Sequence, residues 1–192
     1  MNKNSFLARW ITGIVLAAIL LSIILLASLE ILTLVIAVII AGGLWEYNHI
    51  VFGKGFLKEK IESHLFALAL PFLALIGDER LLIAFMAFAV IIAFMVYLWK
   101  ISGDNLDIST VAKVVFGLFY IPFLTSHFIL LRKLDNGIYW IFLVLVIAIV
   151  GDTLALYVGK SMGRRKLIPL VSPGKTVEGT LGLIVGATLA SC

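Results

Sequence analysis

The chain has 192 residues, of which 62% are hydrophobic and 14% are charged, and its net charge is +4. Soluble globular domains are roughly 45–50% apolar and about 25% charged, so this composition excludes an ordinary soluble enzyme and indicates a polytopic membrane protein. Nucleic acid is a poor candidate partner, because no extended basic domain lies outside the apolar segments. The single cysteine, Cys192, allows no internal disulfide.

Apolar segments that can span a bilayer divide the whole sequence. A helix needs about 20 apolar residues to cross the hydrocarbon core. We expect about seven transmembrane helices, over residues 9–28, 30–51, 64–77, 81–100, 112–131, 137–159 and 176–191. Only a short turn at Ser28 separates the first two, so one long tilted helix is a rival prediction, and Pro71 in the third predicts a kinked or partly re-entrant helix. The prediction is a single all-α domain over residues 1–192, a polytopic helical bundle embedded in the membrane.

The basic residues predict the orientation of this bundle. If the N-terminus is cytoplasmic, twelve of the fifteen lysines and arginines fall on the cytoplasmic side, and only Arg80, Arg132 and Lys133 fall on the other. We therefore expect an integral protein of a bacterial-type cytoplasmic (inner) membrane with a cytoplasmic N-terminus. Its basic loops would face the side where nucleotides and anionic lipid head groups are found.

Asp152 is the first residue that could carry chemistry. It follows an apolar run over residues 138–150 and is expected near the cytoplasmic end of the hydrocarbon region, where an ionisable group suggests a functional site. A structural ion pair or an interfacial carboxylate is the alternative. Helical spacing puts Asp152, Leu156, Gly159 and Gly163 on one stripe. The carboxylate is therefore predicted to be held against a neighbouring helix, facing a protein interior or a wet cavity.

Two pairs of glycines predict close helix packing. Gly159 and Gly163 form one small-x-x-x-small pair, and Gly182 and Gly186 form another in the last apolar segment. Such pairs let the backbones of two membrane helices approach closely.

The segment GRRKLIPLVSPGKT, between the last two apolar segments, is the most basic in the chain. Its Gly-Lys-Thr is not the end of a P-loop, because Pro169 stands where the first glycine is required. Ser172 is predicted to be a helix N-cap and Pro173 the first helical residue. A helix that starts at 174–176 with a lysine and a hydroxyl would be a phosphate site. A loop that only fixes the topology is the alternative.

Glu178 has three alternative roles that the residues leave open. It could stabilise its own helix through the macrodipole, or pair with the basic residues Arg164, Arg165 or Lys166. It could also hold a magnesium ion together with Asp152, since oxygen ligands suit this cation.

Outside this region, Glu46 at the end of the second apolar segment is either an interfacial anchor or a site residue. His64 and His127 have no cysteine or carboxylate at metal-ligand spacing, and we expect both to be structural or interfacial.

The residues of the basic region resemble a known family, the integral-membrane phosphatidate cytidylyltransferases, also called CDP-diacylglycerol synthases. The similarity lies in the ordered block Asp152-Thr153, Ala155, Tyr157, Gly159-Lys160, Gly163-Arg164 and Ser172-Pro173-x-Lys175-Thr176-x-Glu178-Gly179. The chain departs from the family at Leu156, where an aromatic residue is usual, and at Leu183, where a glycine is frequent. The family's C-terminal block, with Lys-Asp, His-Gly-Gly and Asp-Arg-x-Asp elements, does not follow, so the resemblance implies an N-terminal portion of such an enzyme.

The resemblance implies transfer of a cytidylyl group from CTP to phosphatidic acid within the lipid bilayer, giving CDP-diacylglycerol and pyrophosphate, with Mg2+ as cofactor. Catalytic roles are expected for Asp152, Lys175 and Glu178, with Asp152 and Glu178 as metal ligands. Substrate contacts are expected from Lys160, Arg164, Arg165, Ser172 and Thr176. A homodimer is one expected assembly. Two rivals stay open: a CTP-dependent lipid kinase of the polyprenol or dolichol type, which is similar in the same block, and a non-enzymatic lipid-binding membrane protein.

Overall fold

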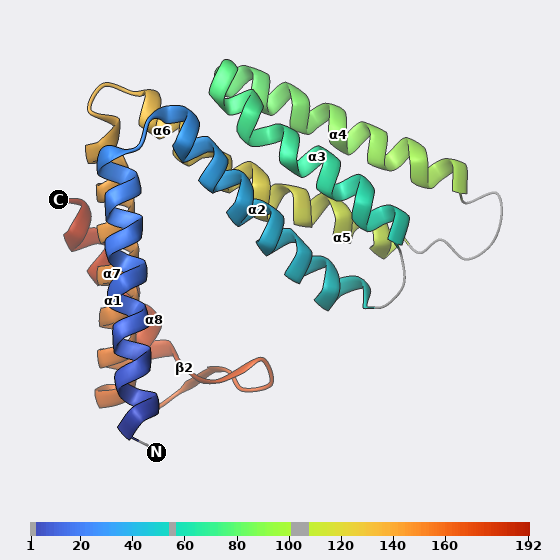
Figure 1. Cartoon of the computed structure of the whole chain (residues 1–192). Coiled ribbons are helices and arrows are strands. Elements are labelled where there is room, and N and C mark those ends of the chain that lie inside the picture. The colour runs from blue at the N-terminus through green and yellow to red at the C-terminus, as the bar shows by residue number, and fades with distance from the viewer. Residues whose placement is uncertain (1–2, 54–56, 101–107) are drawn as a thin grey trace. The chain divides into compact units, whose positions relative to one another are not determined.

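The computed structural model describes residues 3–53, 57–100 and 108–192, and it is almost entirely helical (Figure 1). Contacts divide the chain into two compact units, Met1–Asp135 and Asn136–Cys192. The prediction that residues 1–192 form a single domain is not tested by this division and stays a prediction. Lys54, one of the basic residues that predict the orientation, lies outside the described residues.

The helices of the described chain occupy the predicted positions. The first unit contains α1 (Lys3–Leu26), α2 (Leu29–Phe52), α3 (Leu57–Ile76), α4 (Glu79–Lys100) and a continuous segment of α5 (Ile108–Leu118), the π-helical turn η2 (Phe119–Phe123) and α6 (Leu124–Lys133). The second contains α7 (Gly137–Met162), strands β1 (Lys166–Ile168) and β2 (Ser172–Thr176), and α8 (Val177–Ser191). The largest shift from prediction is at α3, which begins at Leu57 instead of residue 64.

Length and apolarity support a membrane protein. Among the described residues, four helical segments are long and apolar enough to cross a membrane: Leu29–Phe52, Glu79–Val96, Ser109–Lys133 and Gly137–Met162. The apolar parts of α1 and α8 are shorter. The all-α helical architecture is therefore confirmed with one addition, the β1–β2 hairpin, whereas seven membrane crossings stay a prediction.

Ser28 separates α1 from α2. Its backbone is extended, with φ −65° and ψ 164°, and its side-chain oxygen accepts a hydrogen bond from the Ile31 N–H at 3.4 Å. A serine in this conformation is a favourable N-cap, because it satisfies one of the free N–H groups at a helix start. The rival prediction of one long helix is therefore wrong.

The core of the first unit joins α2, α3, α5 and α6. Leu44, Leu70, Leu118 and Ile129, one from each of these helices, are almost fully buried. One buried polar pair joins α2 to α3 at this core: the Asn48 amide donates to the Ser63 hydroxyl at 3.0 Å. Burial of an unpaired amide costs several kcal/mol in an apolar medium, on the order of 2–7, so this pairing lets α2 and α3 pack closely.

Pro122 explains the π-helical turn. Proline has no N–H and its ring clashes with the carbonyl four residues earlier. The chain widens to a π-helical turn over Phe119–Phe123 and then returns to α-helix. Aromatic rings line this turn, where Phe119 stacks on Phe123 with ring centroids 5.3 Å apart. In contrast, α3 continues as α-helix through Pro71 to Ile76.

Lys133 caps the C-terminal end of α3. Its ammonium donates to the carbonyls of Ala74 at 3.2 Å, Leu75 at 3.3 Å and Gly77. The last carbonyls of a helix have no partner within the helix, and a cation is favourable at this negative end of the helix dipole. The last residue of α6 therefore holds the end of α3.

We expect Lys133→Met to destabilise the first unit by about 1 kcal/mol, because three carbonyls lose a charged donor. The measurement is the thermal unfolding midpoint in detergent. Arg80→Met is the matched control, since Arg80 is an exposed basic residue of α4 on the same predicted side. Equal midpoints for the two variants would contradict a capping role for Lys133.

Candidate functional site

The sequence-predicted site residues lie in the second unit, and all except Asp152 are at the end of α7, in the hairpin that follows it or in the first turn of α8. Helices α7 and α8 run antiparallel, because Gly151 meets Leu183 and Ala187 while Gly159 meets Gly179. The antiparallel strands β1 and β2 form a hairpin that leaves this helix pair sideways (Figure 1).

Glycines set the distance between α7 and α8. A Cβ on Gly179 would lie 2.9 Å from the Ala155 carbonyl oxygen, and one on Gly182 would lie 2.9 Å from the Val158 Cβ. A Cβ on Gly186 would lie 3.2 Å from the Val150 carbonyl oxygen. The predicted close packing at the glycine pairs is confirmed.

The predicted start of the last helix is wrong. Ser172 is not an N-cap, because Ser172–Thr176 pairs with β1 as a strand, and α8 begins at Val177. The N-cap is Thr176, whose hydroxyl oxygen accepts the Gly179 N–H at 3.1 Å. The Ser-Pro pair has the composition of a helix start, but strand pairing with β1 extends the backbone for four more residues.

Thr176 is only 6% exposed and lies against Gly159 and Gly163 of α7. Its hydroxyl caps α8 and lies beside Gly159, and its methyl group fills the space beside Gly163. The predicted phosphate contacts of Thr176 and Ser172 stay predictions, and the helix-start phosphate site at residues 174–176 is not formed.

Glu178 closes the base of the hairpin. Its carboxylate accepts the backbone N–H of Arg164 at 3.0 Å and that of Arg165 at 3.3 Å. The Val177 N–H donates to the Arg165 carbonyl at 2.9 Å beside it. Of the predicted roles, the structure supports a pairing with this basic segment, although the partners are backbone groups rather than guanidinium groups.

Asp152 does not face α8. The face of α7 that α8 covers contains Gly151, Ala155 and Gly159, whereas Asp152 is exposed and Leu156 is 54% exposed. Half of the predicted stripe holds: Gly159 and Gly163 lie against the start of α8, whereas Asp152 and Leu156 are exposed, because the contact face further along α7 runs through Gly151 and Ala155 to one side of Asp152. The prediction that this carboxylate is held against a neighbouring helix is wrong for α8. With the described residues its carboxylate forms no hydrogen bond or ion pair.

The structure does not bring Asp152 and Glu178 together. The Glu178 carboxylate lies at the Arg164 N–H, beyond the end of α7 at Met162. Asp152 is ten residues before Met162, which is about 15 Å of helix, whereas ligands lie about 2.0–2.1 Å from a magnesium ion. The described part of the chain contains no group of three His, Cys, Asp or Glu residues that could hold a metal. A single ion shared by these two carboxylates does not fit this arrangement.

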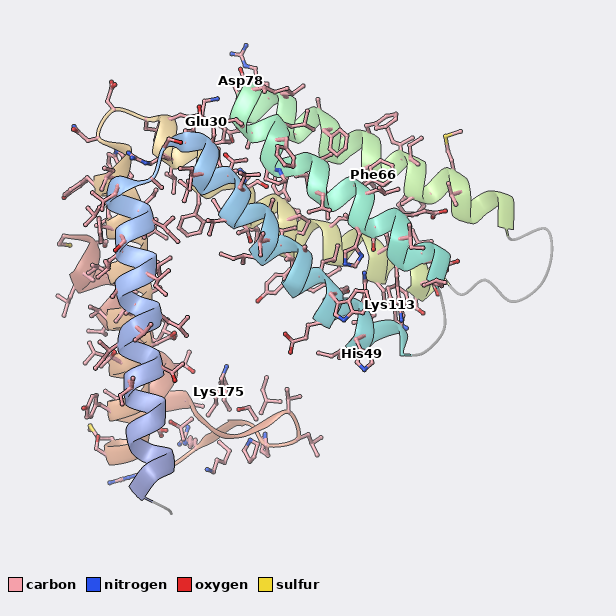
Figure 2. The ribbon with its side chains drawn as sticks, in the orientation of Figure 1. Glu30, His49, Phe66, Asp78, Lys113 and Lys175 are labelled. Atoms are coloured by element: carbon pink, nitrogen blue, oxygen red, sulfur yellow. The ribbon has the colours of Figure 1, made fainter. Side chains whose placement is uncertain are left out.

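Basic side chains surround the hairpin. The side chains of Lys160, Arg164, Arg165 and Lys175 are all exposed, and Figure 2 shows Lys175 projecting from the hairpin. Lys166 instead donates to the Pro173 carbonyl at 2.7 Å, which ties the two strands together. The side chains of Lys160, Arg164, Arg165 and Lys175 are called the cationic cluster below. Because all four are exposed cations, the cluster can attract phosphate groups. Glu178 is the acidic residue at its base.

The sequence profile of the Cytidylyltransferase family matches residues 7–192. The chain belongs to this family. Curated relatives include the phosphatidate cytidylyltransferase of Bacillus subtilis (strain 168), which is 35% identical over 111 residues, or 57% of this chain and 39% of the relative. The phosphatidate cytidylyltransferase of Aquifex aeolicus (strain VF5) is 30% identical over 83 residues, which cover 43% of this chain and 31% of the relative. The matched segments thus span less than half of the length of these relatives.

The similarity to phosphatidate cytidylyltransferases is therefore confirmed at the level of the family. The hairpin and the Glu178 contacts are features that the sequence prediction missed. A signal for the hairpin exists, since the apolar residues Leu167 and Ile168 precede Pro169, and short apolar runs beside a turn residue are typical of strands. No comparable signal reveals that Glu178 binds backbone groups fourteen residues earlier.

We expect Gly182→Leu to separate α7 from α8, because its side chain would meet Val158 and the Leu154 carbonyl at 2.9 and 3.0 Å. Overpacking of this kind costs about 1–3 kcal/mol. The thermal unfolding midpoint in detergent is the measurement, and Gly42→Leu is the control, since Gly42 is also helical but has no atom within 4 Å of its added Cβ. A midpoint for Gly182→Leu as high as that of the control would show that the glycine contact does not set the packing.

We expect Glu178→Ala to release the base of the hairpin, because two backbone N–H groups lose their acceptor. Hydrogen–deuterium exchange of the peptide over residues 163–168 should become several-fold faster. Lys175→Ala is the control, because this exposed side chain has no part in the base of the hairpin. Unchanged exchange in Glu178→Ala would contradict the role given to these hydrogen bonds.

Proposed function

We propose that this chain transfers the cytidylyl group of CTP to phosphatidate, giving CDP-diacylglycerol and pyrophosphate. The observation that carries the proposal is the cationic cluster at the end of two packed apolar helices, in a chain of the cytidylyltransferase family. A lipid phosphate and a nucleotide triphosphate are both anionic, and such a cluster at a membrane surface can attract both. The names of the curated relatives support the choice of phosphatidate as acceptor.

The reaction needs positioning and charge neutralisation more than a covalent intermediate. A phosphate oxygen of phosphatidate attacks the α-phosphorus of CTP and forms a new P–O bond. The bond between the α-phosphorus and the oxygen that bridges to the β-phosphorus breaks, and pyrophosphate leaves with its electron pair. Lys175, Arg164 and Arg165 are proposed to hold the phosphates and to balance the negative charge that grows on the leaving group.

Lys160 and Asp152 are proposed to complete the site on the side of α7. Lys160 lies in the last turn of α7, where it is exposed beside Gly159. Asp152 is an exposed carboxylate in an otherwise apolar helix, and magnesium is often held by one or two carboxylates together with substrate phosphates. Asp152, about 15 Å of helix before the end of α7, is proposed as one such ligand, where a magnesium ion would neutralise the charge of phosphates that reach along α7 from the cationic cluster. Glu178 is proposed to act through its backbone contacts, as a positioning residue that fixes Arg164 and Arg165.

The proposed setting is an inner membrane with the hairpin and the N-terminus on the cytoplasmic face, where CTP is available. The distribution of basic residues supports this orientation. A homodimer is a further proposal, and the experiment below does not require it. It also does not require the family's C-terminal block.

The experiment is turnover of phosphatidate with labelled CTP and magnesium by the chain reconstituted in liposomes. We expect CDP-diacylglycerol and pyrophosphate as products. Lys175→Ala is expected to lower kcat/KM by about 100-fold, as loss of one donor to a developing negative charge does, and Asp152→Asn should reduce it as well. Lys113→Ala is the matched control, since Lys113 is an exposed lysine of the first unit.

Product analysis separates the proposal from its rivals. Release of CDP with a phosphorylated lipid alcohol would show a lipid kinase. Salt-sensitive lipid binding with neither turnover nor CTP binding would show a non-enzymatic lipid-binding protein. CTP binding that Lys175→Ala abolishes, without turnover, would keep the nucleotide site and overturn the claim that this chain completes the reaction.

A further inference from the structure

The tip of the β-hairpin exposes a run of apolar side chains. Leu170 is 99% exposed and Val171 is 80% exposed, and the neighbouring Leu167 and Ile168 are exposed as well. The turn itself is ordered by a hydrogen bond from the Val171 N–H to the Ile168 carbonyl at 3.2 Å. A contiguous exposed apolar surface on an ordered element marks an interaction site.

The hairpin stem differs sharply from its tip. Arg164, Arg165, Lys166 and Lys175 all lie in the stem or at its base, and each side chain is exposed. Glu178 is the acidic residue beside them, and its carboxylate is engaged with backbone N–H groups. The element therefore has a cationic stem and an apolar tip, which is the charge pattern of elements that dock on anionic lipid surfaces.

The direction of the hairpin suits such docking. Helix α7 is long and apolar enough to cross a membrane, and the hairpin leaves the α7/α8 pair sideways instead of continuing along α7 (Figure 1). With α7 across a membrane, a hairpin in this direction would run along the face of the bilayer that the end of α7 reaches. The six residues from Arg165 to Leu170 span at most about 16 Å in extended conformation, so the tip can meet lipids beyond the helix pair.

We propose that the hairpin tip, residues 167–171, inserts into the headgroup region of an anionic bilayer while the basic stem lies on the lipid phosphates. Backbone groups at the outer edges of a two-stranded sheet need water or other partners, so the strands themselves stay out of the hydrocarbon. Only the side chains of the tip enter the boundary between head groups and acyl chains. The stem residues Arg164, Arg165 and Lys175 are also assigned to phosphates in the proposed reaction, but insertion of the tip is argued from residues 167–171 and goes beyond that reaction.

Site-directed spin labelling tests the insertion in the full chain. In a Cys192→Ser background, which removes the single native cysteine, Leu170→Cys carries the label. Gly174→Cys is the matched control, because it lies on the same hairpin and an added Cβ there has no atom within 4 Å. Both variants are reconstituted in vesicles of phosphatidylcholine with phosphatidylglycerol, and collision rates are measured with oxygen and with a water-soluble nickel complex.

We expect the label at position 170 to lie roughly 5–10 Å below the lipid phosphates, and the label at 174 to remain accessible to the nickel complex. In vesicles of phosphatidylcholine alone, the label at 170 should lie at a shallower depth, because the basic stem loses its attraction to the surface. If the label at position 170 lay at the same depth in both kinds of vesicle, the proposal that the basic stem binds the lipid phosphates would be wrong.

Two outcomes would overturn the insertion itself. A label at 170 as accessible to the nickel complex as the label at 174 would place the tip in water. A label at 170 that neither reagent reaches would show that the tip packs against protein. The measurement uses neither CTP nor turnover, so its failure is distinguishable from failure of the proposed reaction.

Discussion

The contact between the backbones of α7 and α8 at Gly159 and Gly179 is the constraint on which the candidate site depends. A Cβ on Gly179 would lie 2.9 Å from the Ala155 carbonyl oxygen and 3.2 Å from the Gly159 Cα, so position 179 has no room for a larger residue. A Cβ on Gly159 would lie 3.1 Å from the Thr176 hydroxyl oxygen, so a larger residue there would displace the side chain that caps α8. Between membrane helices no hydrophobic driving force favours association, and small residues that allow close van der Waals packing take its place. This contact brings the first turn of α8 against the end of α7, where Thr176 caps α8 while it packs on Gly159 and Gly163.

The hydrogen bonds of Glu178 connect the packed helices α7 and α8 to the base of the hairpin. Because the carboxylate binds the Arg164 and Arg165 N–H groups, the first residues after α7 are tied to the first turn of α8. The backbone at the base of the hairpin is thereby fixed, while the guanidinium groups of both arginines stay exposed. A carboxylate that is used in this way neutralises the cluster less than a direct ion pair with a guanidinium group would, which suits a site that attracts anions.

The sequence predicts the helices well and the site only in part. Long apolar segments must form helices in a bilayer because their backbone groups have no other partners, so the helix positions follow from composition. The hairpin cannot be predicted in this way. Ser172-Pro173 satisfies the rules for a helix start, and these residues form a strand only because they pair with β1. The orientation of Asp152 fails for a similar reason: Gly151, one residue earlier, takes the position against α8, and periodicity alone does not choose between adjacent residues. The glycine pairs are predicted correctly because the small size of the residue is itself the signal.

The Asp152 carboxylate needs a partner from outside the second unit. An ionised carboxylate in an apolar helix is costly unless water, a cation or a hydrogen-bond donor faces it, and the described residues provide no hydrogen bond or ion pair to it. Glu178 differs in this respect, because the chain itself satisfies it with two N–H groups. The two carboxylates that look equivalent in the sequence are therefore physically different: Glu178 holds the fold at the end of α7, whereas Asp152 keeps its full capacity to bind. The proposed reaction brings phosphates and a magnesium ion to the membrane surface, and Asp152 is the carboxylate of this unit whose oxygen atoms have no partner among the described residues.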